Sequence, residues 1–170
     1  MRPKPIILAF DTSAAHCAAA LLLGDRVVTR VDEMAKGQAE HLMPMLEGVL
    51  AGEGLTWADL DAIGVGIGPG NFTGIRIAVS AARGLALGLG KPAIGVSGFD
   101  ARAYGQPRPF TATIPAPRGQ SYRQIFLADG TTDTPEQLPT PADAQPTAAA
   151  LITAVARIAA AQASRSVRLT

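Results

Sequence analysis

Three polar side chains at the end of an apolar run, Asp11, Thr12 and Ser13, are of the types that bind a metal-nucleotide or a phosphate. The run at 6–13, IILAFDTS, predicts a buried strand that delivers its last residues at the carboxyl edge of a sheet. One interpretation is residual contact with a nucleotide or phosphate. The other is that the carboxylate and hydroxyls satisfy the turn that follows. We favour the second, because no second acidic loop or adenine-pocket motif is evident.

A glycine-rich turn precedes a long apolar segment in GVGIGPGNFTGIRIAVSAARGLALGL, at 64–89. A Walker-type loop needs a lysine, and none lies between Lys36 and Lys91. A dinucleotide fingerprint fails on spacing, because Gly66 and Gly68 are followed by Asn71 at the third glycine's place. Backbone amides at the helix start could still attract an anion. Any glycine-rich turn that leads into a helix presents such backbone amides, so phosphate binding is not the favoured interpretation.

Histidine, cysteine and serine patterns predict no alternative catalytic site. His16 and His41 lack the H-x-x-x-H spacing that holds a metal on one helix face, and His41 is expected to be a hydrogen-bonded or capping group. His16 and Cys17 are adjacent in an extended segment and should point to opposite faces. The segment at 95–98 lacks the spacing of a nucleophile elbow. We therefore predict no hydrolase, no metal site and no cofactor beyond weak nucleotide binding.

Composition narrows the class of protein further. The chain has 170 residues, is 48% hydrophobic and carries a formal net charge of +1, which gives no strong attraction for nucleic acid or anionic lipid. One cysteine cannot form an intramolecular disulfide, and no signal peptide is evident, so we expect a cytoplasmic protein. Gly, Arg and Pro interrupt every apolar segment, so we expect no membrane span.

The periodicity of apolar residues predicts three strands, a helix, a strand, a helix and a strand. The strands are expected at 6–13, 17–23, 26–31, 63–67 and 93–96, and the helices at 40–53 and 72–89. This order indicates a mixed sheet covered by helices. It matches the ribonuclease-H-like half-domain of actin-type ATPases and sugar kinases, an α/β fold.

Proline changes the character of the chain beyond Tyr104. Eight of the 13 prolines lie at 107–146, so we expect only short strands, at 111–114 and 122–127. The alanine-rich segment 147–163 predicts a closing helix. We thus expect a ribonuclease-H-like domain over 1–105 and an abbreviated, poorly knit second lobe with a closing helix over 106–170.

The helix at 72–89 has two apolar stripes. Small residues form one stripe, and Ile75, Val79 and Leu89 belong to the other, while Arg76, Ser80 and Arg83 form a polar edge. One stripe suffices to dock on the sheet. Helical glycine costs about 0.8–1.0 kcal/mol relative to alanine, so the glycines in the first stripe indicate a compensating close contact.

Two interpretations of that contact remain open. Both stripes could be buried within one subunit, or one could meet a helix, either that at 40–53 or one from a second chain. A short, proline-rich tail leaves little material to cover the helix, so we favour contact with a second chain, to which methionines on the first helix would adapt. The predicted contact residues are Leu42, Met45, Leu46, Val49, Gly74, Ala78, Ala81, Gly84, Leu85 and Gly88.

Several motifs together resemble the TsaB (YeaZ) family. They are ILAFDTS, LLLGDRVV, AEHLMPML and GIGPGNFTGIRIAVSAARGLALGLGKPAIGVSGFDARA, and the similarity covers roughly residues 6–105. The core G-x-G-P-G-[SN]-F-T-G-[ILV]-R followed by G-L-A-L-G is highly specific. The family's second lobe carries an A-R-R-G-E-V-Y-like segment, whereas this chain has APRGQSY at 116–122, which lacks the acidic residue.

The resemblance implies a non-catalytic subunit of the bacterial machinery that attaches a threonylcarbamoyl group to N6 of the adenosine next to the anticodon, in tRNAs reading codons that begin with A. It implies pairing with a TsaD-type catalytic subunit through the two long helices, a TsaE-type ATPase that joins the pair, homodimers through the same surface, and tRNA contact only through the complex. A nucleotide-binding fragment of an actin-like kinase or ATPase is the alternative. The third hypothesis for the function is a peptidase or a metal-dependent transferase.

Overall fold

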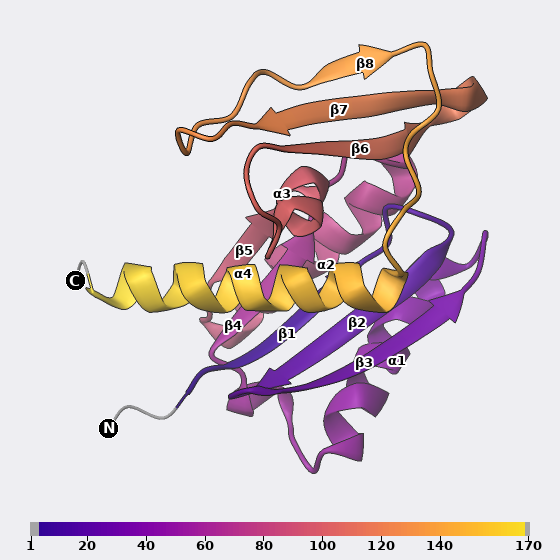
Figure 1. Cartoon of the computed structure of the whole chain (residues 1–170). Helices are drawn as coiled ribbons and strands as arrows, with labels where there is room; N and C mark the ends of the chain where they lie inside the picture. The colour runs from indigo at the N-terminus through magenta and orange to yellow at the C-terminus, as the bar shows by residue number, and fades with distance from the viewer. Residues whose placement is uncertain (1–3, 169–170) are drawn as a thin grey trace.

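The main element of the structure is a five-stranded mixed sheet, shown in Figure 1 as a computed structural model that describes residues 4–168. Its strands are β1 (Ile6–Asp11), β2 (His16–Leu23), β3 (Arg26–Glu33), β4 (Ala62–Gly66) and β5 (Ala93–Val96), in the order β3-β2-β1-β4-β5. The first three are antiparallel, and β4 and β5 run parallel to β1. The predicted α/β fold is confirmed.

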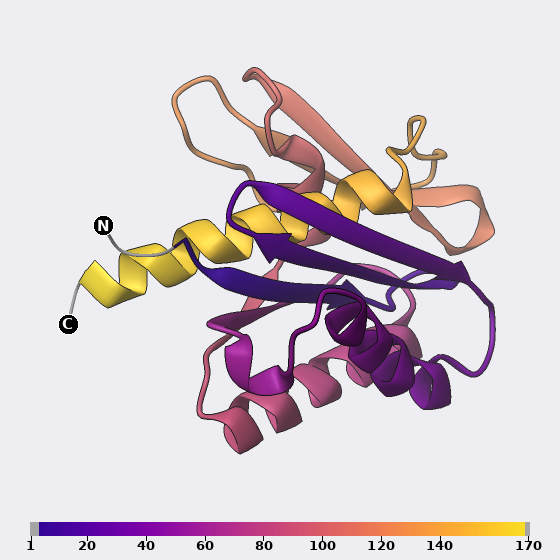
Figure 2. The same ribbon diagram turned by 90° about the horizontal axis from the view of Figure 1, so that it is seen from below.

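Helices cover both faces of this sheet (Figure 2). One face carries α1 (Gln38–Gly52) and α2 (Phe72–Leu89), and the other carries α4 (Ala148–Arg168). Alternate residues of β1 point to opposite faces of the sheet. Leu8 and Phe10 pack with α1 and α2, and Ile7 and Ala9 pack with α4. Burial on both faces explains why β1 is continuously apolar.

A smaller antiparallel sheet forms the second part of the molecule. It contains β6 (Phe110–Ala116), β7 (Gln120–Phe126) and β8 (Glu136–Leu138) in that order, and α3 (Gly98–Ala103) connects the first sheet to it. Short 3₁₀ helices occur at Trp57–Asp59 and Pro117–Gly119. Phe99 of α3 packs with Ala112, Ile114 and Phe126 in a separate small core. Both strands predicted in this region are present, whereas α3 and β8 are too short to show a sequence period.

The closing helix lies elsewhere than expected. The sequence interpretation assigned it to the second lobe, but α4 packs on β1, β2 and β4 of the first sheet. Its apolar face, which includes Ile152 and Val155, covers the side of that sheet that α1 and α2 leave open. Apolar area on the sheet therefore decides where α4 lies. The division of the chain at residue 105 stays a prediction.

Among residues 4–168, α2 is the one helix with the length and composition of a membrane span. The sequence interpretation had expected no such segment. Its inner side packs on the first sheet, with Ala78 and Ala82 fully covered, while Arg76 and Arg83 are exposed on its outer side. A helix with one face in the core and arginines on the other belongs to the packed domain.

Candidate functional site

The polar groups at the end of β1 make their hydrogen bonds within the chain. Asp11 Oδ1 accepts from the Ser13 backbone N–H at 2.7 Å and from Ser13 Oγ at 2.6 Å. The Thr12 side chain is fully buried, and its Oγ1 donates to the Gly74 carbonyl at 2.5 Å. The arrangement is the one expected if these groups satisfy the local turn. Nucleotide contact at Asp11, Thr12 and Ser13 stays a prediction.

Glycines at the end of β4 and in the segment that follows it allow the end of β1 to approach closely. A Cβ atom at Gly66 would lie 1.7 Å from Asp11 Oδ2, and one at Gly74 would lie 1.9 Å from the Thr12 carbonyl oxygen. At Gly70 it would lie 2.6 Å from the Ser13 carbonyl oxygen. Three glycines thus face three consecutive residues. The glycine-rich turn permits backbone packing between two loops, which answers why glycine is needed there.

Asn71 begins α2 and joins it to the same loop. Its Oδ1 accepts from the Gly74 N–H at 2.8 Å, which is the expected N-cap bond. Its own backbone N–H donates to the Ser13 carbonyl at 2.8 Å. Two backbone N–H groups at the start of α2 therefore donate within the chain, which leaves fewer N–H groups free to bind an anion.

Asp11 also has a partly buried histidine as a neighbour. His16 Nε2 lies 3.9 Å from Asp11 Oδ1, and both side chains are about one-fifth exposed, at 18% and 19%. Burial is the largest single influence on the pKa of Asp11 and raises it, but interactions with His16 and the hydrogen bonds from Ser13 together outweigh burial. The pKa of Asp11 consequently lies below its ordinary value of 3.8.

This shift predicts the pH dependence of stability. Because the folded-state pKa of Asp11 is depressed, its ionised form stabilises the fold above the ordinary value of 3.8, and that contribution is lost as pH falls toward the folded-state pKa. Asp11→Asn should thus lower the free energy of unfolding at neutral pH, with a difference from wild type that shrinks below that value. Urea unfolding of both proteins across this range measures it.

Asp129→Asn is the matched control for this measurement. Asp129 accepts from the backbone N–H and hydroxyl of Thr131 just as Asp11 does from Ser13, but it lies in an exposed turn. We expect a much smaller difference there, because water replaces the lost interactions. Equal effects of the two substitutions at neutral pH would contradict the role given to the environment of Asp11.

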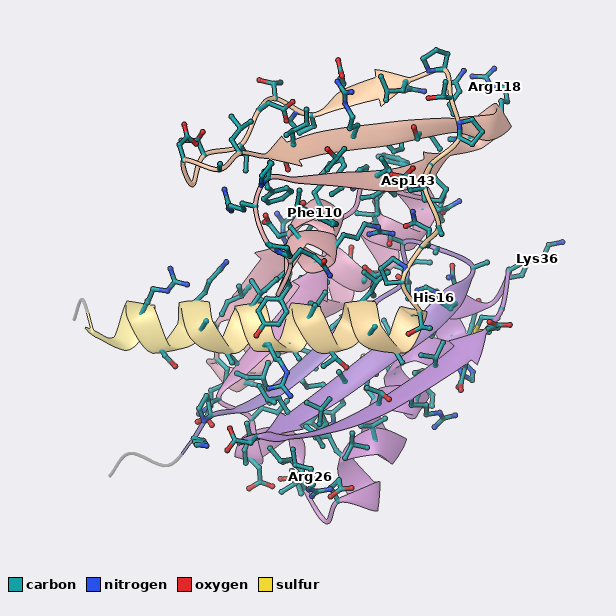
Figure 3. The ribbon with its side chains drawn as sticks, viewed as in Figure 1. His16, Arg26, Lys36, Phe110, Arg118 and Asp143 are labelled. Carbon is teal, nitrogen blue, oxygen red and sulfur yellow. The ribbon has the colours of Figure 1, made fainter. Side chains whose placement is uncertain are left out.

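A cleft of about 820 Å³ lies between the two sheets, with Asp11 and His16 among its lining residues. The last residues of β1, β4 and β5 line it, so it lies at the carboxyl ends of the three parallel strands. Figure 3 labels His16 on the first sheet and Asp143 on the segment leading from the second sheet to α4, at the same end of the molecule. Cavities of this size and position are suited to small ligands.

The remaining histidine and the cysteine have structural partners. His41 Nε2 lies 2.6 Å from Asp32 Oδ2, as expected of a hydrogen-bonded group. Cys17 is fully buried and contacts Met34, whereas His16 lines the cleft, so the two residues point to different sides of the sheet, as predicted. Within residues 4–168, no group of three or more His, Cys, Asp or Glu side chains could hold a metal ion.

The structure separates the predicted contact residues into three sets. The covered set is Leu42, Met45, Leu46, Val49, Gly74 and Ala78, all buried by their own chain. Ala81 and Leu85 are partly buried, and Gly84 and Gly88 are exposed. The covered set offers almost no accessible surface to a second chain in this structure, and its contact with a partner stays a prediction. The reason for the burial is geometric: the small-residue stripe drifts around α2, and its first half faces the sheet.

The outer side of α2 carries large apolar side chains that the sequence interpretation missed. Phe72 is 72% exposed and Leu87 is 87% exposed. The Arg76 guanidinium carbon lies 5.4 Å from the centre of the Phe72 ring, a cation–π distance. A groove of about 430 Å³ between α1 and α2 is lined by residues that include Arg76, Ile77 and Ser80. We call Phe72, Ile77, Gly84, Leu87 and Gly88 the outer α2 face.

A signal for Leu87 was present in the sequence. Arg76, Ser80 and Arg83 follow one another at spacings of four and three, and the next step of four along this polar edge reaches Leu87. A large apolar residue that continues a polar edge is an exception that marks a candidate contact.

Comparison with known proteins identifies the family. A protein-family model described as TsaD, tRNA N6-adenosine threonylcarbamoyltransferase, matches residues 32–160, more than half of the chain. The tRNA threonylcarbamoyladenosine biosynthesis protein TsaB of Escherichia coli (strain K12) is 36% identical over 128 residues, covering 72% of this chain and 55% of that protein. The chain belongs to the TsaB (YeaZ) family. TsaB of Haemophilus influenzae is 39% identical over 99 residues, which cover 57% of this chain and 41% of that protein. The chain thus spans about half the length of these TsaB relatives.

Solved structures agree with the family and the fold. YeaZ from Pseudomonas aeruginosa superposes with a TM-score of 0.67 at 32% identity, covering 84% of this chain and 71% of that one. The ethanolamine utilization protein EutJ from Carboxydothermus hydrogenoformans gives a TM-score of 0.52 at 16% identity, covering 82% and 54% respectively. The second likeness shows the fold alone. This TsaB-family chain thus has the actin-like, ribonuclease-H-like fold.

The segment in which this chain departs from the TsaB pattern connects β6 to β7. Arg118 lies at its tip with φ of 62°, in the left-handed region that non-glycine residues rarely occupy. Gln120, at the place of the family's acidic residue, hydrogen-bonds through its side chain to Gln137 of β8. The replacement therefore joins two strands of the small sheet through neutral groups.

Proposed function

We propose that this TsaB-family chain is a non-catalytic subunit that supports threonylcarbamoyl transfer to N6 of the adenosine next to the anticodon, in tRNAs that read codons beginning with A. The names of its relatives support the pathway, because TsaB of E. coli and of H. influenzae are named tRNA threonylcarbamoyladenosine biosynthesis proteins.

The observation that carries the proposed role is the outer α2 face. Among the residues whose burial is described, Phe72 and Leu87 are the two most exposed large apolar side chains, and both project from the same helix. Gly84 and Gly88 have nothing within 4 Å of the place a Cβ atom would take, so a partner helix can approach closely beside Leu87. An exposed apolar side chain next to a flat backbone surface is typical of a contact site.

The partner proposed for this face is a TsaD-type catalytic subunit, which the outer sides of α2 and α1 would contact. A TsaE-type ATPase then joins the pair, and a homodimer forms through the same face when TsaD is absent. Contact with tRNA occurs only through the complex, because the formal net charge of +1 gives the chain little attraction of its own for RNA. The proposed location is the cytoplasm.

The chemistry at the end of β1 supports assignment of catalysis to the partner. Thr12 is fully buried and donates to Gly74, and Ser13 donates to Asp11, so neither hydroxyl is arranged as a nucleophile with a base. The His16 side chain lies beside the same Asp11 carboxylate, with Nε2 3.9 Å from Asp11 Oδ1. These contacts are those of a turn held in one conformation.

Copurification of the tagged chain with the cognate TsaD-type protein tests the proposal. Leu87→Asp should weaken the association by about tenfold or more, because a partner would have to bury an unpaired carboxylate where a leucine fitted. Leu87 is 87% exposed, so the substitution should leave the isolated chain folded.

Leu127→Asp is the matched control. Leu127 is also an exposed leucine, at 38%, but it follows β7 in the second sheet, away from α2. We expect the control to copurify as wild type does. Equal recovery of TsaD with both variants would refute contact through the outer α2 face.

The alternative of an actin-like nucleotide-binding fragment is distinguished by titration. The proposed function expects weak or no ATP binding by the isolated chain and negligible hydrolysis. Tight ATP binding that Asp11→Asn abolishes would favour the alternative, because the carboxylate would then contribute to a metal-nucleotide site.

A further inference from the structure

The cleft between the two sheets contains a guanidinium group without an anionic partner. Arg102 of α3 donates from Nε to Gln145 Oε1 at 2.7 Å and from Nη1 to the Gly98 carbonyl at 2.9 Å. Both acceptors are neutral. No carboxylate oxygen of the described residues lies within 4.0 Å of Arg102. These two bonds fix the position of the guanidinium and leave Nη2 without an identified bond.

Burial makes this arrangement costly. The Arg102 side chain is partly buried, and burial lowers its pKa, while the charge of Asp11 only partly opposes that change. A desolvated cation is stabilised when an anion reaches it, and guanidinium groups bind planar anionic heads through two parallel hydrogen bonds. The two hydrogen bonds of Arg102 therefore hold its guanidinium at the cleft wall before any anion binds.

The rest of the cleft is suited to an apolar body. Its walls include Ile114 of β6 and Leu151 and Val155 of α4, and its volume of about 820 Å³ falls in the range of small-molecule sites. Asp11 also lines the cleft, paired with His16. A ligand with several negative charges would be repelled by that carboxylate, whereas a single negative charge can pair with Arg102 alone.

We propose that the cleft binds an organic monoanion, with its charged head on Arg102 and its apolar body against α4. This site lies between the two sheets and beside α4. Because α1 and α2 cover the opposite face of the first sheet, the site is separate from the proposed partner face. The proposal does not depend on the proposed function.

Fluorescence titration of the full chain with 8-anilinonaphthalene-1-sulfonate tests the site, because this probe joins one negative charge to an apolar body. Arg102→Gln should weaken its binding roughly tenfold or more, as expected for loss of a charged hydrogen-bonding partner. N-phenyl-1-naphthylamine, which lacks the sulfonate, should bind both proteins equally. Arg26→Gln, which removes an arginine of β3 that pairs with Glu53 at the end of α1, is the matched control and should bind the sulfonate as wild type does.

Two further variants locate the probe. Ala148→Trp places a large side chain in the cleft at the start of α4 and should exclude both probes, even if Arg102→Gln proves poorly folded. Leu87→Asp should leave probe binding unchanged, because the outer α2 face lies elsewhere. Equal sulfonate binding by wild type and Ala148→Trp would overturn the proposal. Tighter binding of ATP than of the sulfonate would also overturn it, since the site would then accept a polyanion.

Discussion

Replacement of Gly74 by alanine is expected to lower the free energy of unfolding by about 3 kcal/mol, even though alanine is the better helix former. The added Cβ atom would lie 1.9 Å from the Thr12 carbonyl oxygen, which is backbone and cannot rotate away. The same region holds the hydrogen bond from Thr12 Oγ1 to the Gly74 carbonyl. Separation of α2 from β1 would therefore break that bond as well. Thermal unfolding should show a melting temperature lower by about 6–12 °C.

Gly84→Ala is the matched control, because it makes the same change three turns along the same helix. Nothing lies within 4 Å of the Cβ position at Gly84. Helix propensity then acts alone and should raise the free energy of unfolding by about 0.8–1.0 kcal/mol. Opposite signs for the two substitutions are the expected result. A Gly74→Ala protein as stable as wild type would show that close packing does not explain the glycine.

The second large effect concerns Leu46, which sequence reasoning placed at a partner contact and the structure places in the core. Leu46 is 0% exposed and lies in the cluster that α1 forms with β1 and β2. Leu46→Ala should lower the free energy of unfolding by about 2–5 kcal/mol, through lost apolar burial and the cavity that remains. Urea denaturation of the isolated chain measures this change.

Leu87→Ala removes the same atoms from the other helix and provides the comparison. Because Leu87 is 87% exposed, its truncation should change the free energy of unfolding by no more than about 0.5 kcal/mol. Its effect should appear in association with TsaD instead. If Leu87→Ala were as destabilising as Leu46→Ala in the isolated chain, the outer α2 face would be part of the core.

Much of the fold could be predicted because the strands and long helices carry local periods. The helix at 72–89 and the strand at 93–96 have the bounds that the sequence predicted. The elements that were missed, α3 and β8, are six and three residues long, too short for a period to appear. The closing helix was predicted along the chain as part of the second lobe, whereas α4 packs on the first sheet.

The candidate site was less accessible to prediction. Asp11 was singled out by type, yet its neighbours His16 and Gly66 come from different strands, and Arg102 of α3 was not singled out at all. Arg102 and Gln145 are 43 positions apart, and only the return of the chain through the second sheet brings them together.

The amino-acid sequence by itself determined the order of strands and helices, the glycine positions and the family motif, because each of these depends on residues that are close together along the chain. The tertiary structure alone decided which half of the small-residue stripe faces the sheet, why Gly74 must be glycine, and where α4 packs. These outcomes depend on distances between segments remote in sequence. Such distances follow from how the apolar faces cover one another, which no local period encodes.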